Sequence, residues 1–410
     1  MADLRPFRAF RPRPDIAERV AAPPYDVIST AEARALAEGN PFSFLHVSRP
    51  EIDLPEGTDE HADEVYAKGR ENLEALIADG VLTQDAEPRF YVYAQAMPVP
   101  GSNGSASVHR QTGIVACAAV ADYDADRIKK HEKTRADKED DRTRHIGDLS
   151  AHDEPVFLTY PKVPAIDAVV EAAKLAIPAY DFKTRDGVQH QLWPVDREVG
   201  AELGRLFAAV PTLYVADGHH RSAAASRVHK SRKGDGMEHD AFLAVVFPHD
   251  QMKIMAYNRV VRDPAGRSPE ALLEAIGGVF DLAPTSEPAP NEPKTFGVYC
   301  GGSWWRARVR RFDASDPVAA LDCSILQTQI LEPVLGVKDP RRDAHIDFVG
   351  GIRGARELEK RVGEGASIAF HLYPTSIAEL IAVSDAGLLM PPKSTWFEPK
   401  LRSGLFLHTF

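Results

Sequence analysis

Four polar residues and a glycine, Asp217-Gly218-His219-His220-Arg221, follow an apolar run from Thr212 and precede an alanine-rich run. The pattern predicts a buried strand, a tight turn and a helix. A helix start exposes N–H groups without acceptors, so it binds anions such as phosphate. Gly218 permits close approach of a ligand, Arg221 can hold a phosphate through two donors, and Asp217 can bind Mg²⁺ or an adjacent imidazole. The alternative is a structural turn with a helix cap and two surface histidines.

A second candidate is the charged stretch from Ile128 to Ile146, in which both signs are interleaved. A carboxylate surrounded by cations stays ionised and can act as a base, and the same cations can hold phosphate oxygens. A solvated, salt-bridged helix or loop is the usual explanation of such a run, and it stays open here. The residues that carry the chemical interpretation are His131, Glu132, Lys133, Thr134, Arg135, Lys138, Arg142 and Arg144.

Two further segments carry weaker signals. In the segment KSTWFEPK, the residues Lys393, Ser394 and Thr395 offer one cation and two hydroxyls, but the preferred interpretation is a loop anchored by Trp396 and Phe397. Near the amino end, packing explains the polar residues almost as well as a site does. These residues are Tyr25, Asp26, His46 and Arg49.

The elements that must position these residues alternate between helix and strand. A capping box at Ser29-Thr30-Ala31-Glu32 predicts a helix start, and a second amphipathic helix is predicted over 59–78. Strand-like runs from Arg89 and Thr112 flank a glycine- and serine-rich loop, and Asp186-Gly187 is typical of a hairpin turn. The fold class predicted is α+β, with mixed sheets and helices.

Three segments are predicted along the chain: an N-terminal α+β segment over 1–125, a catalytic core over 126–265, and a C-terminal α+β segment over 266–410. The segment APTSEPAPNEPK, from Ala283, is rich in proline and poor in apolar residues. This composition favours a linker.

The composition of the chain disfavours several classes of function. The 410 residues carry a formal net charge of −11, which disfavours a general nucleic-acid binder held by phosphate contacts. The 3 cysteines are scattered and form no C-x-x-C pair, so a zinc ribbon or disulfide framework is not expected. No apolar run is long enough for a membrane span, and no targeting signal is visible, so we expect no membrane partner and a cytoplasmic location.

Several long blocks resemble one bacterial and archaeal family, the domain-of-unknown-function family numbered one thousand and fifteen. The blocks are NPFSFLHVSRPEIDLP, IKKHEKTRADKEDDR, LYVADGHHR, MAYNRVV and MPPKSTWFEPKLRSGLFLH. Together they extend over nearly the whole chain. Family membership by itself implies little chemistry.

A more distant resemblance implies a specific chemistry. The strand–DGHHR–helix segment is similar to the signature loop of the ParB/sulfiredoxin superfamily, whose members include kinases acting on free L-serine. Those kinases carry a D-G-H-H-R loop for the phosphates and an upstream His-Glu pair whose glutamate acts on the substrate hydroxyl. Asp217 to Arg221 match the loop one by one, and His131 and Glu132 match the pair. The resemblance therefore implies a ParB/sulfiredoxin-like nucleotide-binding core.

Other members of the superfamily fit less well. A sulfiredoxin needs a cysteine nucleophile in a G-x-C-H-R loop, where this chain has His219. A partition protein has a G-x-R-R-type loop followed by a helix-turn-helix, and neither is visible. A metal-dependent phosphohydrolase that uses both loop histidines and Asp217 is also weaker, since consecutive side chains diverge.

The chain differs from the free-serine kinases in the spacing between the glutamate and the loop. Glu132 precedes Asp217 by 85 residues, much more than in the compact kinases of the group. An inserted strand–helix–hairpin over 156–193 would account for the interval. Glu139 and Glu154 are reserve candidates for the carboxylate.

Together, the residues and the resemblance predict a kinase that transfers phosphate from ATP, with Mg²⁺, to the hydroxyl of free L-serine. ADP and pyrophosphate remain open as donors, and other small hydroxyl compounds as acceptors. Catalytic roles are predicted for His131, Glu132, Asp217 and His220, with Asp217 also as metal ligand. Nucleotide contacts are predicted for Gly218, His219, Arg221, Lys133, Thr134 and Arg142. The alternative function is a non-enzymatic nucleotide-binding regulator. The sequence predicts no oligomeric state.

Overall fold

The computed structural model describes residues 2–100, 106–232 and 238–410. Its internal contacts divide the chain into two compact units. The first unit contains Met1–Lys130, Thr134–Met252 and Pro399–Phe410, and the second contains His131–Lys133 and Lys253–Glu398. Each unit is therefore built from segments that are not contiguous in the sequence.

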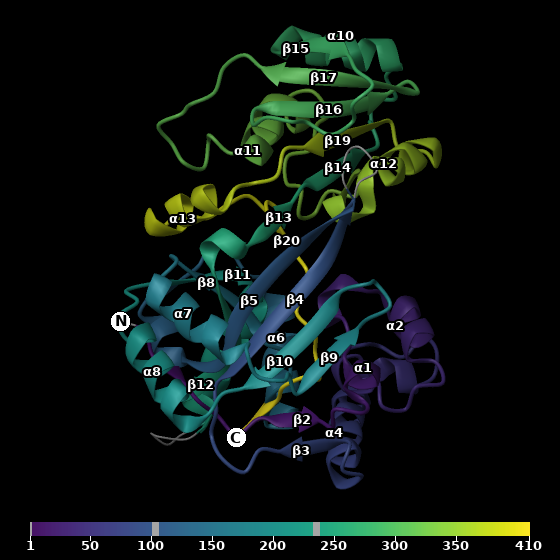
Figure 1. Ribbon diagram of the computed structural model, residues 1–410. Helices are drawn as coiled ribbons and strands as arrows, with labels where there is room; N and C mark the ends of the chain where they lie inside the picture. Colours follow the sequence, from purple (N-terminus) through teal and green to yellow (C-terminus); the bar gives the residue numbers. More distant parts are fainter. Residues whose placement is uncertain (1, 101–105, 233–237) are drawn as a thin grey trace. The chain divides into compact units, whose positions relative to one another are not determined.

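A mixed sheet forms the centre of the first unit (Figure 1). Among the described residues it has nine strands, in the order β6-β11-β8-β12-β5-β4-β10-β9, with β1 on β5. Their bounds are β1 Leu4–Arg5, β4 Tyr91–Pro100, β5 Ala106–Ala119, β6 Ile128–Lys129, β8 Val156–Tyr160, β9 Tyr180–Lys183, β10 Gln189–Pro194, β11 Leu213–Asp217 and β12 Ala241–Pro248. Strands β4 and β5 pair antiparallel, as their alternating patterns predict, while their connecting loop, 101–105, lies outside the described residues.

The interior strands are apolar because both of their faces are covered. Every residue of β8 and of β12 is buried, and these two strands run parallel. Helices α7 (Pro164–Ala173) and α8 (Arg197–Phe207) pack on each other and contribute to the same apolar core as the sheet. Because β8 lies between β11 and β12, the segment predicted as an insertion begins with an interior strand of the sheet.

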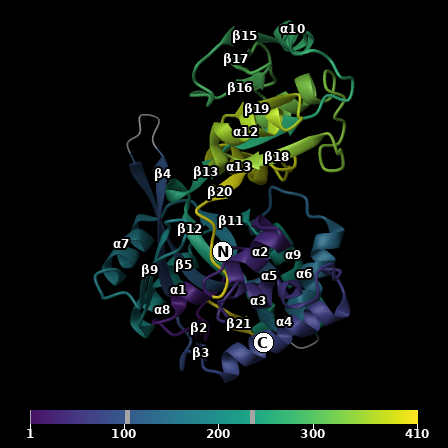
Figure 2. The same cartoon turned by 90° about the vertical axis from the view of Figure 1, so that its right-hand side faces the viewer.

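Helices α6 (Ala136–Leu149) and α9 (His219–Ser231) lie side by side in the first unit (Figure 2). A separate apolar cluster joins the end of α6 to α2 (Thr30–Ala37), α3 (Leu45–Ser48) and α4 (Asp63–Ala78), and it includes Leu407 from the returning C-terminal segment. The remaining short α-helices and β-strands of this unit are α1 Ala17–Val20, α5 Val120–Asp124, β2 Phe10–Pro12, β3 Leu82–Gln84, β7 Ala151–His152 and β21 His408–Thr409.

Local sequence signals are confirmed where they depend on neighbouring residues. The Ser29 hydroxyl accepts from Glu32 N–H and the Glu32 carboxylate accepts from Ser29 N–H, which is the predicted capping box of α2. The helix predicted over 59–78 begins later, at Asp63. Strands β9 and β10 form the predicted hairpin, with Gly187 at φ +81° in its turn.

The second unit is built on its own sheet, in the order β15-β17-β16-β19-β14-β18. Its strands are β14 Tyr257–Val261, β15 Phe280–Pro284, β16 Thr295–Cys300, β17 Ser303–Val309, β18 Ile346–Gly350 and β19 Ile368–Leu372, and β13 Lys253–Met255 pairs with β20 Trp396–Glu398. Its α-helices are α10 Pro269–Val279, α11 Asp322–Leu326, α12 Gly354–Gly363 and α13 Ile377–Asp385.

Two expectations about organisation differ from the structure. The proline-rich segment from Ala283 is no linker, because it connects β15 and β16 of one sheet. The boundary predicted near residue 125 does not separate two sheets, since β5 and β6 belong to the same one. The predicted fold class, α+β with mixed sheets, is confirmed. Among the described residues, no helix is both long and apolar enough to cross a lipid bilayer.

Candidate functional site

The DGHHR loop lies between strand β11 and helix α9, as its residue pattern predicts. Gly218 is the N-cap of α9 and has φ +94°, a backbone conformation that favours glycine. A Cβ at this position would lie 3.0 Å from Cζ of Arg221. The guanidinium of Arg221 can therefore lie this close to the loop only because residue 218 has no side chain. The residues Ala223, Ala224 and Ala225 are buried, which places the helix close to its neighbours.

Three charged side chains of the first unit meet at the loop. Asp217 Oδ2 lies 3.3 Å from Nη2 of Arg221 and 3.5 Å from Nζ of Lys400. Burial alone would raise the pKa of Asp217, but Lys400 and Arg221 hold this pKa well below its usual range. The carboxylate is therefore ionised, with one cation from its own helix and one from the C-terminal segment.

The guanidinium of Arg221 is turned inward. Its side chain is 6% exposed, Nη1 donates to the carbonyl of Pro155, and Nη2 donates to Asp217. A two-donor grip on a phosphate would require the guanidinium to exchange these partners. The geometry thus fits Arg221 as a positioning residue that ties the loop to the segment before β8, and its predicted phosphate contact stays a prediction.

A second buried cluster surrounds Glu154, one of the two reserve candidates. Its Oε1 accepts from the N–H of Tyr25 at 3.0 Å and from the hydroxyl of Ser403 at 2.8 Å. The Arg142 guanidinium lies 3.9 Å from the ring centroid of Tyr25. Arg142, Glu154 and Arg221 line a cavity of about 10 Å³, the size of one water molecule. Arg142 is thereby packed into the protein, and this cavity has no room for a nucleotide.

Burial raises the pKa of Glu154 to about 7, against the opposing effect of the cations Arg221 and Arg142. The folded protein therefore binds this proton more tightly than the unfolded chain does, and the resulting stability is lost as the pH rises from 4.5 to about 7. Glu154→Gln keeps the shape and cannot titrate. We expect the variant to gain stability relative to the parent across this window, by up to about 1.4 kcal/mol per pH unit.

The measurement is urea unfolding of both proteins at several pH values from 4 to 8. Below the window both side chains are neutral, so the stability difference should be small and constant there. A difference that does not change with pH would contradict the raised pKa of Glu154.

The charged stretch is partly helical and lies beside the loop within the first unit. The N–H of Arg135 donates to Nε2 of His220 at 3.1 Å, and Arg227 of α9 pairs with Asp140 of α6 at 2.6 Å. The hydroxyl of Thr134 donates to the other reserve candidate, Glu139. These contacts bring Thr134, His220 and Glu139 into one region, and the run has the ion pairs expected of a salt-bridged helix.

The segment His131–Lys133 belongs to the second unit. The carbonyl of His131 accepts from Met390 N–H at 2.8 Å. The ring Nε2 of His131 lies 3.3 Å from the Thr395 hydroxyl. Glu132 is half-buried and Lys133 is exposed. The roles predicted for these three residues stay predictions.

A family model described as DUF1015, a protein of unknown function, matches residues 4–324. The chain belongs to the DUF1015 family. No curated protein matches it. The matched residues include the whole DGHHR loop and exclude Lys400 and Ser403.

Three solved structures are similar to this DUF1015 chain, each at 12% identity. A free serine kinase in complex with AMP has a TM-score of 0.35, over 70% of this chain and 86% of that one. SbnI with a C-terminal truncation, from Staphylococcus aureus, has a TM-score of 0.36, over 69% and 82%. A conserved hypothetical protein from Pyrococcus furiosus has a TM-score of 0.34, over 71% and 93%.

The loop does not suit a magnesium ion held by Asp217, the metal ligand predicted in this DUF1015 chain. Its Oδ2 already has two cationic partners, Arg221 and Lys400. A dication on the same oxygen would bring three positive groups together, which is unfavourable without further carboxylates. Oδ2 of Asp217 therefore does not fit the ion.

The C-terminal segment KSTWFEPK is mainly structural up to Glu398. Phe397 is buried, and the ring of Trp396 packs edge-on against Tyr257 with centroids 5.0 Å apart. The Ser394 hydroxyl donates to the carbonyl of Pro391 at 2.6 Å. This anchoring agrees with the preferred interpretation of the segment.

Sequence reasoning missed Lys400, the last residue of that segment, and Ser403, which lies just beyond it. Lys400 contacts the DGHHR loop, and Ser403 holds Glu154. Tyr25, whose signal was weak, lies in the same buried cluster. The available signal was the block MPPKSTWFEPKLRSGLFLH, which resembles the family and contains both missed residues.

Proposed function

We propose that this DUF1015 protein is a phosphotransferase that moves a phosphoryl group from a nucleotide such as ATP to the hydroxyl of free L-serine, giving O-phosphoserine. The observation that carries the proposal is the start of α9. A glycine N-cap at positive φ, without a side-chain cap, opens a 13-residue helix directly after a buried strand. Such a helix start binds phosphate through backbone N–H groups and the helix dipole.

The surrounding charges support the same assignment. Lys400 adds a positive charge to that of the helix dipole near the start of α9. Arg221 holds the loop in place through its hydrogen bond to the Pro155 carbonyl. Transfer of a phosphoryl group depends mainly on positioning and charge neutralisation, which this arrangement can supply. The residue-by-residue match of Asp217 to Arg221 with free-serine kinases adds the substrate class.

In the proposed reaction, the serine oxygen forms a bond to the transferred phosphorus as the bond to the departing nucleotide oxygen breaks. The hydroxyl proton passes to the carboxylate of Glu132 late in the transfer, because a carboxylate is a much weaker base than an alkoxide. No step is assigned to a protein-held metal ion.

The test is a screen of ATP, ADP and pyrophosphate as donors against L-serine and small alcohols as acceptors, with products identified by mass spectrometry. We expect O-phosphoserine from one donor, and loss of the product in Gly218→Ala, since a Cβ there meets Arg221 and the positive φ is strained. The matched control is Gly204→Ala in α8, where nothing lies within 4 Å of the new Cβ. Tight nucleotide binding with no product from any acceptor would overturn the kinase and favour the regulator.

A further inference from the structure

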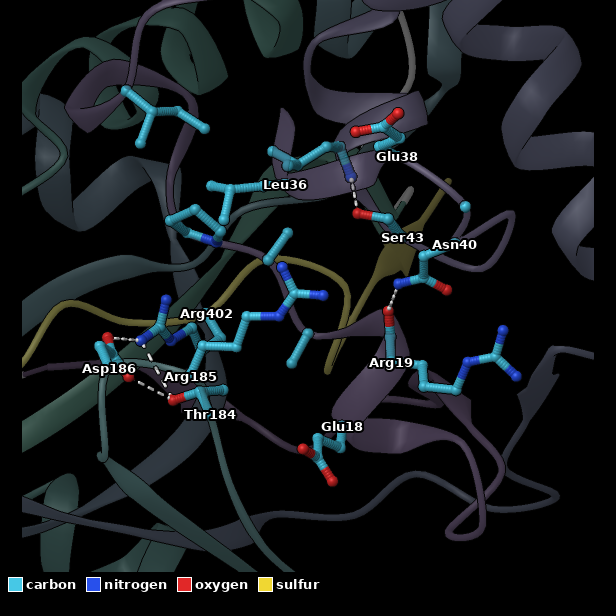
Figure 3. Close-up of a pocket in the computed structure, with 16 residues that line it drawn as sticks. Glu18, Arg19, Leu36, Glu38, Asn40, Ser43, Thr184, Arg185, Asp186 and Arg402 are labelled. Atoms are coloured by element: carbon cyan, nitrogen blue, oxygen red, sulfur yellow. Dashed lines mark hydrogen bonds and ion pairs between the residues drawn. The ribbon is translucent and has the colours of Figure 1, made fainter. Parts of the chain in front are cut away.

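The first unit contains a cavity that none of the proposed kinase residues lines. Its volume is about 600 Å³, within the range of small-molecule binding sites (Figure 3). The walls come from α1, α2 and the segments that follow them, from the β9–β10 turn, and from Arg402 of the C-terminal segment. The cavity is lined by both charged and aliphatic side chains.

Arg402 is a buried, pre-oriented cation in the wall. It is 8% exposed, its Nη2 pairs with Asp186, and the same nitrogen donates to the Thr184 hydroxyl at 3.3 Å. That hydroxyl also lies 3.1 Å from Nε2 of His190, so the supporting residues are themselves held. Within the described residues, Nε of Arg402 is buried without a hydrogen-bond partner and Nη1 makes no hydrogen bond. Because Nε is buried, Nη1 is the donor of Arg402 that remains for an anion in the cavity.

A second cation stands on the same side of the cavity. Arg185 is exposed, and Figure 3 shows its side chain extending from the β9–β10 turn into the cavity, near Arg402. No hydrogen bond or ion pair holds its guanidinium to any other part of the chain that the structure describes. Two guanidinium groups are thus available for one carboxylate.

Acidic and aliphatic groups line other parts of the cavity. Glu18 and Glu38 are exposed lining residues, and neither has an ion-pair partner in the ranges described. The aliphatic lining includes Ile28, Leu36 and Leu45. The three arginines of the lining, at 19, 185 and 402, are balanced by Glu18, Glu38 and Asp186. A neutral charge sum with separated signs disfavours a polyanion such as a nucleotide and favours a ligand that carries both signs.

We propose that this cavity binds a small aliphatic zwitterion, a free amino acid or a dipeptide. Its carboxylate is held by Arg402 and Arg185, its ammonium group by one of the two exposed carboxylates, Glu18 or Glu38, which lie on opposite sides of the cavity in Figure 3, and its side chain by the aliphatic wall. Binding here does not depend on the proposed phosphotransfer, because the cavity lies apart from the helix start that carries that proposal. The two proposals can therefore fail separately.

The experiment is isothermal titration calorimetry of the full chain, without nucleotide, with L-leucine and leucyl-leucine as probes. N-acetyl-leucine removes the ammonium charge and leucinamide removes the carboxylate, so each analogue should bind at least about ten-fold more weakly than leucine. Arg185→Ala should weaken leucine binding by about ten-fold, since it removes one of two cations without disturbing a contact of the fold. The matched control, Arg205→Ala on α8, should bind as the parent does.

Absence of binding by both leucine and leucyl-leucine at millimolar concentration would overturn the proposal. Equal affinity for leucine and either analogue would overturn it too, because one of the two charges would then have no role. Unchanged binding in Arg185→Ala would remove the site from this cavity.

Discussion

Arg221→Lys should lower the turnover of nucleotide and serine by about two orders of magnitude while the protein remains folded. Lysine keeps the charge but lacks the planar fork, so it cannot bind the Pro155 carbonyl and Asp217 together in the way that arginine does. The loop should then shift, and a displacement of about 1 Å at a phosphate site is enough for a loss of this size.

Two measurements distinguish the predicted loss of turnover from a loss of stability. The melting temperature must stay close to that of the parent, and Arg227→Lys serves as the control, because Arg227 lies on the same helix and forms an exposed pair with Asp140. Turnover near the parent level in Arg221→Lys would show that the DGHHR loop is only a structural turn.

Glu132→Gln should reduce the rate of transfer to serine by about 10²–10⁴, the range expected for loss of a general base. Nucleotide affinity should barely change, since the phosphates are assigned to the start of α9. Glu132→Asp should fail as well, because a carboxylate shortened by one methylene is misplaced by about an ångström. Single-turnover kinetics and equilibrium nucleotide binding measure the two quantities separately.

The comparison variants are Glu139→Gln and Glu154→Gln. In the structure, Glu154 accepts from Tyr25 and Ser403, and Glu139 accepts from Thr134, so both hold protein groups in place. Normal turnover in Glu132→Gln with a loss in one of these two would mean that the match of Glu132 to the kinase glutamate is wrong. Loss of nucleotide binding in all three would assign the charged stretch to phosphate binding, without an acceptor base.

Features set by near neighbours could be predicted from the sequence. The capping box of Ser29 and Glu32 acts across three residues, and the β9–β10 hairpin depends on Asp186-Gly187. The DGHHR loop belongs to the same class, because an apolar strand, a glycine and a small-residue helix follow each other directly.

Features set by distant contacts could not be predicted. Ser403 meets Glu154 across 249 residues, and nothing near either one indicates the other. The composition of the proline-rich segment predicts a linker, yet the Pro288 carbonyl approaches Gly297 of β16 so closely that a Cβ there would lie 1.9 Å from it. The inward turn of Arg221 likewise depends on Pro155, which only the folded sheet brings near.

The C-terminal segment Pro399–Phe410 completes the first unit only after the chain has passed through the second. During synthesis, the ribosome must therefore translate Lys253–Glu398 before Lys400 can reach Asp217 or Ser403 can reach Glu154. Because synthesis adds only about 5–20 residues per second, the nascent first unit spends seconds without these contacts. A chaperone that binds nascent chains would bind the unit in this interval, and the DGHHR loop would be among the last parts of the unit to reach its final contacts.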